Sequence, residues 1–528
     1  MRDGRCSIIR ASRHAPDGTQ QMTAPPSAIV AALLQQAIGC HQHGKFDAAR
    51  ELYGQVLALA PRQFDALHLS GVAARQLGQV DTALALIGRA IGIDPAQANA
   101  HCNLGAALQD AGRPDEALAS YDRAIALNPG YALALCNRGN TLRNLGRLEE
   151  AIGSYQRALA LRPAYPEAHC NLALALHDAG RAGEALASAG RALGGRPDYP
   201  EALCARARAL HGLHRFGEAL RDYDRAIALK PDWAEARCWR GAALQRLQRF
   251  DEALAAYESA LALKPDYPLA HQYRANTLRA LGRPAEAVAA YRSALAQGGD
   301  ATQIGYALAA LGVGQAPAAA PAAYVAGLFD QYADHFDHHL VGVLGYQMPA
   351  LLDAAIRRAF SPRDADTLDL GCGTGLCGPY LRAYSKHLVG VDLSEKMLDK
   401  ARLAGCYDAL FRSELAQYLS GRTDVCDLVV AADVFVYIGD LAPVFGAVHG
   451  ALRPGGGFCF SVEACDSGEF TLRPSNRFAH SLAYVRALAA AAGFEVVEAE
   501  RRAGREEDGV GVMAYAVTLR SLKPKAAL

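Results

Sequence analysis

The same arrangement of small and larger apolar residues recurs every 34 residues from residue 30 to about residue 301. Small residues come ten positions after each of seven prolines, alanine comes twelve positions later, and larger apolar residues lie between them. The prolines are Pro61, Pro95, Pro129, Pro163, Pro197, Pro231 and Pro265. The small residues are Gly71, Gly105, Gly139, Ala173, Ala207, Gly241 and Ala275, followed by Ala83, Ala117, Ala151, Ala185, Ala219, Ala253 and Ala287. Small residues are needed where two helices cross closely, so this pattern predicts repeated helical hairpins.

Each predicted hairpin has a turn residue in its middle and a helix terminator at its end. Turn glycines stand between the two helices at Gly78, Gly112, Gly146, Gly180 and Gly282, and the proline ends the second helix. Counting from the prolines gives eight repeats, which begin near residues 30, 64, 98, 132, 166, 200, 234 and 268. One hairpin cannot bury its own apolar face, so we expect the eight to stack over residues 30–301.

This in-phase pattern resembles the tetratricopeptide repeat family over about half of the chain. The resemblance implies an all-α superhelix whose concave groove holds a protein or peptide partner. Asn103, Asn137 and Asn171 occupy the sixth position of three consecutive repeats, close to the expected inner face. Their amides are candidates for bonding an extended peptide backbone, and the alternative is that they only face solvent.

Cysteines recur at the fifth position of five repeats, next to these asparagines. They are Cys102, Cys136, Cys170, Cys204 and Cys238. Equivalent positions in stacked helices lie roughly 10 Å apart, which is too far for a disulfide. We therefore expect free thiols in a reducing cytoplasm, and a groove without the charge of a carboxylate clamp.

Three segments flank the repeats. Residues 1–29 have no apolar signal-peptide core, so we expect a disordered leader in which Met22 is an alternative start. Residues 302–323 are expected to be a linker because GVGQAPAAAPAA breaks the helical period. The segment 324–340 has aromatic residues at helical spacing and is expected to close over a cofactor pocket. Its three histidines lack a matching carboxylate or cysteine set, so no metal site is expected.

Residues 324–528 alternate apolar strand-like runs with helical segments. The runs end in TLDLG, VGVDLS, CDLVVAADVFVYI and LRPGGGFCFSVE, and two final strands follow a helix at SLAYVRAL. This order predicts a doubly wound α/β sheet of seven strands with an antiparallel hairpin at its edge. The charged stretch RRAGREEDG is expected to form the turn of that hairpin.

The chemistry-bearing motif is DLGCGTG, residues 369–375, after the first strand. Its glycines let the backbone approach a ligand closely, and Asp392 ends the second strand, where a carboxylate can hold ribose hydroxyls. Gly373-Thr-Gly375-Leu-Cys-Gly378 also satisfies the GxGxxG dinucleotide pattern. The acid two residues before the first glycine and the closing hairpin make that second interpretation less consistent with the sequence.

With LRPGGG in order behind them, these motifs resemble class I S-adenosylmethionine-dependent methyltransferases over residues 365–520. The whole layout is similar to predicted bacterial methyltransferases fused to tetratricopeptide repeats. The resemblance implies that Asp369, Gly371, Gly373 and Gly375 contact the methionine part of S-adenosyl-L-methionine and that Asp392 holds the ribose. Glu414 is then expected at the adenine amine and Asp433 near the methyl group, unless Asp433 is an ordinary strand-end carboxylate.

The acceptor side of the site is less defined by the sequence. Tyr437 and His480 are candidates for a general base, and Arg473 and Arg477 are candidates for holding an anionic substrate. A hydrogen-bonded structural role is the alternative for His480. The stretch Asp433-Val-Phe435-Val-Tyr437 departs from the (D/N)PP(Y/F) signature of amide- and adenine-methylating families. That departure counts against those two acceptors.

Composition narrows the partners further. The formal net charge is zero, with 51% apolar and 20% charged residues, so no basic field favours nucleic acid. No apolar run approaches the length of a membrane span. The sequence thus predicts a cytoplasmic methyltransferase whose repeats recruit a protein or peptide-bearing substrate. The alternatives are a small-molecule O- or N-methyltransferase whose repeats serve assembly, and a non-catalytic interaction scaffold.

Overall fold

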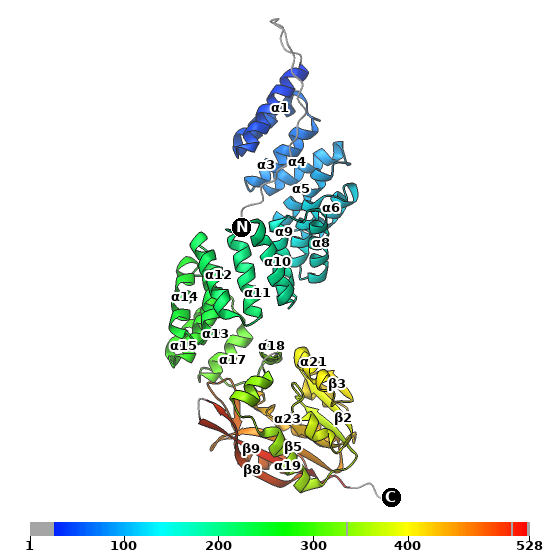
Figure 1. Cartoon of the computed structure of the whole chain (residues 1–528), viewed down its shortest axis with the longest axis vertical. Coiled ribbons are helices and arrows are strands. Elements are labelled where there is room, and N and C mark those ends of the chain that lie inside the picture. Colours follow the sequence, from blue (N-terminus) through cyan, green and yellow to red (C-terminus); the bar gives the residue numbers. More distant parts are fainter. Residues whose placement is uncertain (1–25, 334–335, 508–509, 525–528) are drawn as a thin grey trace. The chain divides into compact units, whose positions relative to one another are not determined.

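The computed structural model describes residues 26–333, 336–507 and 510–524 (Figure 1). These residues form two compact units, one that ends at Gln248 and one that begins at Arg249. The division falls inside the seventh predicted repeat, not in the predicted linker. The predictions for residues 1–25, including the alternative start, lie outside the described residues, and the first helix already begins at Pro26.

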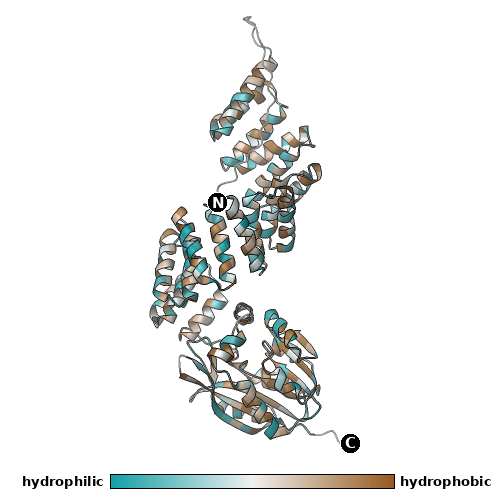
Figure 2. Cartoon of the chain, viewed as in Figure 1, coloured by the Kyte–Doolittle hydropathy of each residue, from teal (hydrophilic) through white to brown (hydrophobic). Residues whose placement is uncertain are grey.

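The first compact unit is all helical, and the predicted hairpins are confirmed. Its helices are α1 (Pro26–Gln42), α2 (Phe46–Leu59), α3 (Phe64–Gln76), α4 (Val80–Ile93), α5 (Ala98–Asp110), α6 (Pro114–Leu127), α7 (Ala132–Asn144), α8 (Leu148–Leu161), α9 (Pro166–Asp178), α10 (Ala182–Gly195), α11 (Pro200–Gly212), α12 (Phe216–Leu229) and α13 (Ala234–Arg246). Figure 2 shows hydrophilic and hydrophobic residues side by side along these helices, as amphipathic packing requires.

Tyrosines on the second helices explain the small residues on the first ones. A Cβ atom added to Gly105 would lie 2.7 Å from the ring of Tyr121, and one on Gly139 would lie 2.6 Å from the ring of Tyr155. Both tyrosines are fully buried. A larger side chain at either glycine would therefore separate the two helices of its hairpin.

The predicted turn glycines adopt the left-handed backbone that ends the first helix of each hairpin. Gly112 has a φ of 71° and Gly146 a φ of 74°. In the sixth and seventh repeats the same place is held by His214 and Gln248, with φ values of 57° and 58°. The turn geometry is therefore retained where glycine is absent.

The five periodic cysteines form no disulfide, and all five are buried. Cys102, Cys136 and Cys170 are between 1% and 3% exposed, and Cys204 and Cys238 are also buried. Cys102, Cys136 and Cys170 pack among alanine and leucine in the helical core. The expectation that the cysteines determine the character of the groove is therefore wrong.

The second compact unit begins with four helices: α14 (Phe250–Leu263), α15 (Pro268–Ala280), α16 (Pro284–Ala296) and α17 (Ala301–Ala310). The predicted linker is wrong over its first part, because α17 continues the array. Ile304 of α17 is fully buried in one apolar cluster with Tyr291 and Ala294 of α16. Its sequence kept helical spacing, and the turn comes only at Gly312, with a φ of 78°.

The rest of this unit is an α/β sheet of nine strands. These are β1 (Ala365–Leu370), β2 (Ser385–Asp392), β3 (Ala409–Arg412), β4 (Cys426–Ala431), β5 (Leu452–Ala464), β6 (Phe470–Leu472), β7 (Phe478–His480), β8 (Phe494–Glu507) and β9 (Val510–Ser521). Strands β3-β2-β1-β4-β5 are parallel in that order. The antiparallel pair β8–β9 is added through β9, which pairs with β5.

The predicted doubly wound fold is confirmed, with two differences. The described sheet has nine strands rather than seven, because β6 and β7 form a short antiparallel hairpin that joins β5 at Glu463 and Ala464. The predicted strand 426–438 stops at Ala431. There the chain turns through Asp433, with a φ of 54°, into a 3-10 helix, η2 (Phe435–Tyr437).

Helices cover both faces of the sheet. They are α18 (Ala322–Tyr332), a π-helix η1 (His338–Val343), α19 (Met348–Phe360), α20 (Gly378–Arg382), α21 (Glu395–Ala404), α22 (Leu415–Leu419), α23 (Ala442–Ala451) and α24 (Leu482–Ala491). Alternate residues of β4 enter different cores: Leu428 and Val430 pack with α19, while Val429 packs with α23 and α24. Burial on both faces explains the continuous apolar runs of the parallel strands.

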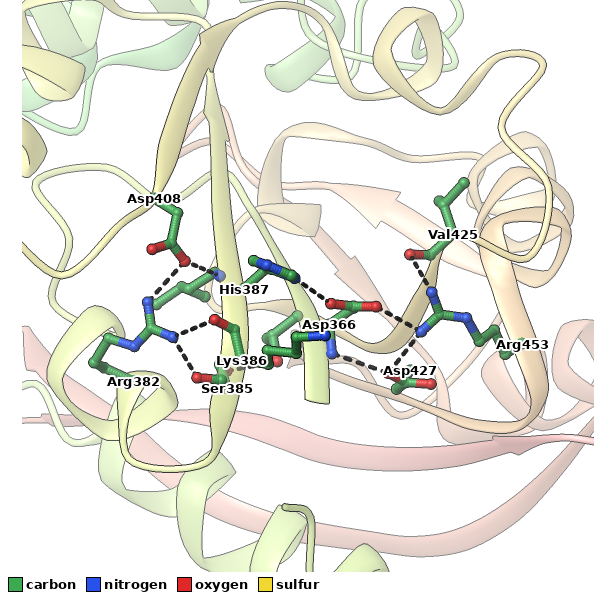
Figure 3. Close-up of polar contacts among 11 residues, drawn as sticks. Asp366, Arg382, Ser385, Lys386, His387, Asp408, Val425, Asp427 and Arg453 are labelled. Atoms are coloured by element: carbon green, nitrogen blue, oxygen red, sulfur yellow. Dashed lines mark hydrogen bonds and ion pairs between the residues drawn. The ribbon is translucent and has the colours of Figure 1, made fainter. Parts of the chain in front are cut away.

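An ionic network ties the amino ends of these strands together (Figure 3). Asp366 at the start of β1 pairs with Arg453 of β5 at 2.8 Å and with His387 of β2 at 2.7 Å. Arg453 also pairs with Asp427 of β4 at 2.8 Å. His387 and Arg453 hold the pKa of Asp366 below its usual value. Because these groups are partly exposed, they fix strand register more than they add stability.

Candidate active site

The opposite edge of the sheet brings the predicted glycine motif and Asp392 together. Strands β1 and β2 are parallel neighbours, with Asp369 opposite Gly390. The loop after β1 has positive φ at Gly371 (66°), Gly373 (54°) and Gly375 (92°). A Cβ atom on Gly371 would meet the side chain of Val434, whereas one on Gly373 would have nothing within 4 Å. The loop is therefore packed on one side and open at Gly373.

Asp392 holds this loop in shape. One oxygen of its carboxylate accepts a hydrogen bond from the backbone N–H of Gly373 at 2.9 Å, and the other accepts from the N–H of Ser394 at 2.9 Å. Asp392 is only 9% exposed, and this burial raises the pKa of its carboxyl group. The carboxylate is thus fixed at the strand end by two backbone donors.

Asp369 is the second carboxylate at this edge. It is 1% exposed, and burial raises the pKa of Asp369 to about 7, while a hydrogen bond from Tyr407 opposes the rise. The hydroxyl of Tyr407 donates that bond at 2.7 Å. A buried carboxyl with a single donor is suited to a cationic ligand, because such a ligand stabilises its charged form.

Tyr407 was not predicted from the sequence, although its ring packs against the glycine loop. Cβ atoms built on Gly375 and Gly378 would each lie 3.1 Å from its ring, and one on Gly390 would lie 3.0 Å away. The ring of Tyr407 is thus a shared neighbour of three glycines, together with Cys406 at Gly378 and Leu410 at Gly390. The signal was the glycine at Gly390 in the middle of an apolar strand, since such a glycine marks a close approach.

The segment predicted to cover the pocket contacts this loop. Asp330 of α18 accepts a hydrogen bond from the hydroxyl of Ser394, and Asp337 accepts one from the hydroxyl of Thr374, each at 2.5 Å. The ring of Phe329 lies edge-on to Tyr437, with centroids 5.5 Å apart. Of the three histidines, His335 lies outside the described residues. No metal-binding cluster occurs among the residues that the structure describes.

A group of charged side chains lies at the carboxyl ends of β4 and β5. Glu463, whose side chain is 3% exposed, pairs with Arg505 at 2.5 Å, Arg473 at 3.1 Å and Arg477 at 3.7 Å. Arg505 also pairs with Asp433 at 3.3 Å. We call these five residues the arginine cluster. Three guanidinium groups and two carboxylates give it a formal charge of +1.

Two members of the arginine cluster, Glu463 and Arg505, were not predicted. Asp433 is held at the strand end by Ser461, whose hydroxyl donates to its carboxylate at 2.7 Å. Tyr346 lies close to Asp433, Arg505 and Asp369, and burial raises its pKa well above the usual value. No motif in the sequence marks Glu463 or Arg505 themselves, so only the fold brings these groups together.

The family comparisons agree with this architecture. The family described as "Methyltransferase domain" matches residues 368–458. Families described as tetratricopeptide repeat match residues 98–131, 234–267, 120–153, 42–98, 200–233 and 268–293, and one described as TPR repeat matches residues 139–180.

The chain thus carries tetratricopeptide repeats followed by a methyltransferase domain.

Several relatives of the methyltransferase domain are named as O-methyltransferases. The ubiquinone biosynthesis O-methyltransferase of Bordetella pertussis is 30% identical over 165 residues, which span 28% of this chain and 65% of that enzyme. The malonyl-[acyl-carrier protein] O-methyltransferase of Enterobacter lignolyticus is 28% identical over 143 residues, or 27% of this chain and 55% of that enzyme. The crystal structure of the APC/C hetero-tetramer Cut9-Hcn1 is 17% identical, covers 50% of this chain and 52% of its own, and has a TM-score of 0.41.

The two candidate bases of the methyltransferase domain lie in different environments. Burial raises the pKa of Tyr437, an increase that Arg477 partly offsets. His480 is fully buried, its Nε2 lies 3.0 Å from the carbonyl oxygen of Gly439, and its ring stacks on Tyr484. Burial lowers the pKa of His480 to about 4. These contacts favour a packing role for His480.

The roles of Glu414 at the adenine and of the three repeat asparagines in partner binding stay predictions. Glu414 is exposed two residues after β3 and occupies the N-cap position of α22 without a side-chain capping bond. It follows Ser413, whose N–H donates to the backbone oxygen of Asp392 at 3.0 Å. The repeat asparagines are half-buried and each lies against the preceding repeat. The amide nitrogens are 2.9 Å from His68 Nε2 for Asn103, 3.9 Å from Cys102 Sγ for Asn137, and 3.8 Å from Cys136 Sγ for Asn171.

Proposed function

We propose that this protein is an S-adenosyl-L-methionine-dependent methyltransferase. The observation that carries the proposal is the glycine loop that is bonded to Asp392 and backed by the buried Asp369. The open side of Gly373 leaves room for a ligand against the backbone, and two carboxylates complement a positively charged one. When bound, the cofactor supplies a methyl group on a sulfonium, which an acceptor takes by direct displacement.

Different residues of the chain would hold different parts of the cofactor. Asp369, Gly371, Gly373 and Gly375 would hold the methionine part and Asp392 the ribose, with Glu414 at the adenine. Asp433 would line the pocket beside them. The chemistry depends mainly on alignment and on the exclusion of water. The contacts from Asp330 and Asp337 place α18 and the following segment where they help exclude it.

The acceptor that the arginine cluster favours is an anion. Arg473 and Arg477 are 36% and 28% exposed, and the cluster retains one positive charge after internal pairing. Guanidinium groups bind carboxylate and phosphate well because their donors match both oxygens. Burial raises the pKa of Tyr437 further above neutral pH, which disfavours it as a base, so we assign it a hydrogen-bonding role toward the acceptor.

The repeats would recruit or position a protein or peptide-bearing substrate through Asn103, Asn137 and Asn171. The described cysteines form no disulfide, which accords with a cytoplasmic protein. No helix among the described residues is long and apolar enough to cross a bilayer. The second candidate is a small-molecule O-methyltransferase whose repeats serve assembly, which the similarity to the ubiquinone biosynthesis enzymes favours.

Calorimetric titration of the full chain with S-adenosylmethionine and S-adenosylhomocysteine tests this proposal. We expect micromolar binding of both, after which isotope-labelled cofactor identifies the acceptor. If neither binds, the scaffold alternative is favoured.

Once the acceptor is known, the role of the repeats can be tested by replacing the three asparagines together with alanine. We expect this variant to raise KM for a recruited acceptor and to preserve kcat, whereas an unchanged KM would contradict recruitment through the asparagines.

Cofactor affinity should also depend on pH. Because the pKa of Asp369 is about 7 in the free protein, a cationic ligand that requires its charged form must displace a proton below that pH. We expect S-adenosylmethionine to bind about tenfold more weakly at pH 6 than at pH 8. Calorimetry at both pH values measures the change, and the Asp369→Asn variant should not show it. An affinity that stays constant from pH 8 to pH 6 would contradict the assignment of Asp369.

A further inference from the structure

We propose that the end of the repeat array is a built-in part of the acceptor site. Helices α15 and α17, together with α18, hold the β6–β7 hairpin, which carries Arg473 and Arg477. Asn476 receives the hydrogen bonds of this junction, and Tyr306 supplies its apolar packing. The acceptor role of the two arginines rests on the proposed function. The mechanical coupling between helices and hairpin does not, because it follows from contacts inside one compact unit.

Asn476 is the point where three helices meet the hairpin. Its side-chain oxygen accepts a hydrogen bond from Arg279 of α15 at 2.6 Å, and its side-chain nitrogen donates to the hydroxyl of Tyr324 of α18 at 3.2 Å. Its backbone oxygen accepts from the hydroxyl of Tyr306 of α17 at 2.7 Å. The residue is 5% exposed and has a φ of 62°. These bonds compensate for a buried, left-handed asparagine.

The position of Asn476 in the turn links it directly to the two arginines. Its N–H donates to the backbone oxygen of Arg473 at 2.9 Å, and the N–H of Arg473 donates to the backbone oxygen of Arg477 at 2.9 Å. A shift of Asn476 therefore moves both guanidinium groups relative to Glu463. The side chain of Asn476 bonds to Arg279 and Tyr324 rather than to Glu463 or Asp433, so it acts as a positioning residue.

Apolar packing fixes the same junction. Tyr306 is 2% exposed and lies in one buried cluster with Leu472 of β6 and Phe478 of β7. Its ring centroid is 6.3 Å from that of Phe478 and 5.4 Å from that of Tyr324. Both strands of the hairpin thus rest on α17. The hairpin has only three residues in each strand, and so short a pair is not stable alone.

The rest of the predicted linker is bound to the other wall of the acceptor site. The backbone oxygen of Ala318 accepts hydrogen bonds from Gly439 at 2.8 Å and Asp440 at 3.0 Å, and the N–H of Ala320 donates to the backbone oxygen of Tyr437 at 2.8 Å. The linker is therefore attached to the loop that carries Tyr437. The cofactor groups Asp369 and Asp392 lie on β1 and β2 and make none of these contacts.

Hydrogen exchange in the full chain tests the coupling. In Arg279→Ala we expect the amides of residues 470–480 to exchange about tenfold faster or more, because a hydrogen bond from a charged donor is lost. Amides of residues 365–392 should not change. The matched control is Arg283→Ala, since Arg283 is exposed and pairs with Glu286 three residues away. Arg279→Lys should restore part of the protection.

A chemical probe reports on the arginines themselves. Phenylglyoxal modifies accessible guanidinium groups, and its rate at Arg473 and Arg477 should rise several-fold in Arg279→Ala as their pairing with Glu463 loosens. The S-adenosylhomocysteine affinity should stay unchanged. Unchanged exchange and labelling in Arg279→Ala would overturn the inference, as would equal loosening of residues 365–392. If the unmodified chain does not bind S-adenosylhomocysteine but the hairpin still loosens, the proposed function fails and the coupling stands.

Discussion

Replacing Asp392 with alanine is expected to weaken S-adenosylhomocysteine binding by about 100-fold, because more than one hydrogen bond to a charged group is lost. The N–H groups of Gly373 and Ser394 lose their acceptor, so the loop loses its shape as well as its proposed ribose contact. The chain should remain folded, because Asp392 lies at the end of β2 and its pKa, raised by burial, shows that its charge is costly there. Calorimetry on the full chain measures the affinity.

The matched control is Asp399→Ala on the neighbouring helix α21. Its side chain is 62% exposed and pairs with Arg402 within the same helix, so it should leave the affinity unchanged. Near-normal affinity in Asp392→Ala would remove Asp392 from the site. Weak binding in both variants would point to a general effect of lost negative charge.

Replacing Glu463 with alanine is expected to lower the free energy of unfolding of the methyltransferase domain by about 3–5 kcal/mol. Glu463 and Arg505 have side chains that are 3% and 4% exposed. The substitution leaves Arg505, Arg473 and Arg477 together without the carboxylate that they share. Uncompensated charge in a buried place is among the largest single-residue penalties.

Hydrogen exchange of β5 amides in increasing urea isolates this effect from the unfolding of the repeats. Repeat arrays can unfold separately from a neighbouring globular domain, so a single whole-chain transition would mix the two contributions. Glu463→Gln keeps the shape and the hydrogen-bond acceptor, and its loss should be smaller. A change below about 1 kcal/mol in Glu463→Ala would contradict the view that this carboxylate neutralises the arginine cluster.

The sequence predicted best those features that short stretches of chain encode. The hairpin repeats follow from one small residue and one turn per 34 residues, and the left-handed Gly112 and Gly146 lie where the pattern placed them. The glycine motif and Asp392 also lie together, because parallel neighbouring strands bring their carboxyl ends to one edge.

What the sequence did not predict depends on partners far apart in the chain. Arg505 was assigned to the charged turn after the first closing strand, but β8 extends through it and delivers it to Glu463, 42 residues away. Strands β6 and β7 have three residues each, too few for an alternating pattern to emerge. Tyr407 follows no motif, and its role appears only when three glycines surround its ring.

The tyrosine–glycine contacts have a consequence for how such proteins vary. Tyr121 meets Gly105 and Tyr155 meets Gly139, each within its own 34-residue repeat. Duplication or deletion of 34 codons in register would preserve every such contact, so the array can change length in whole steps during evolution. The last helices of the array are different, because α15 and α17 are hydrogen-bonded to Asn476 of the methyltransferase domain. We therefore expect relatives of this fusion to differ in the number of their early repeats and to keep the final one.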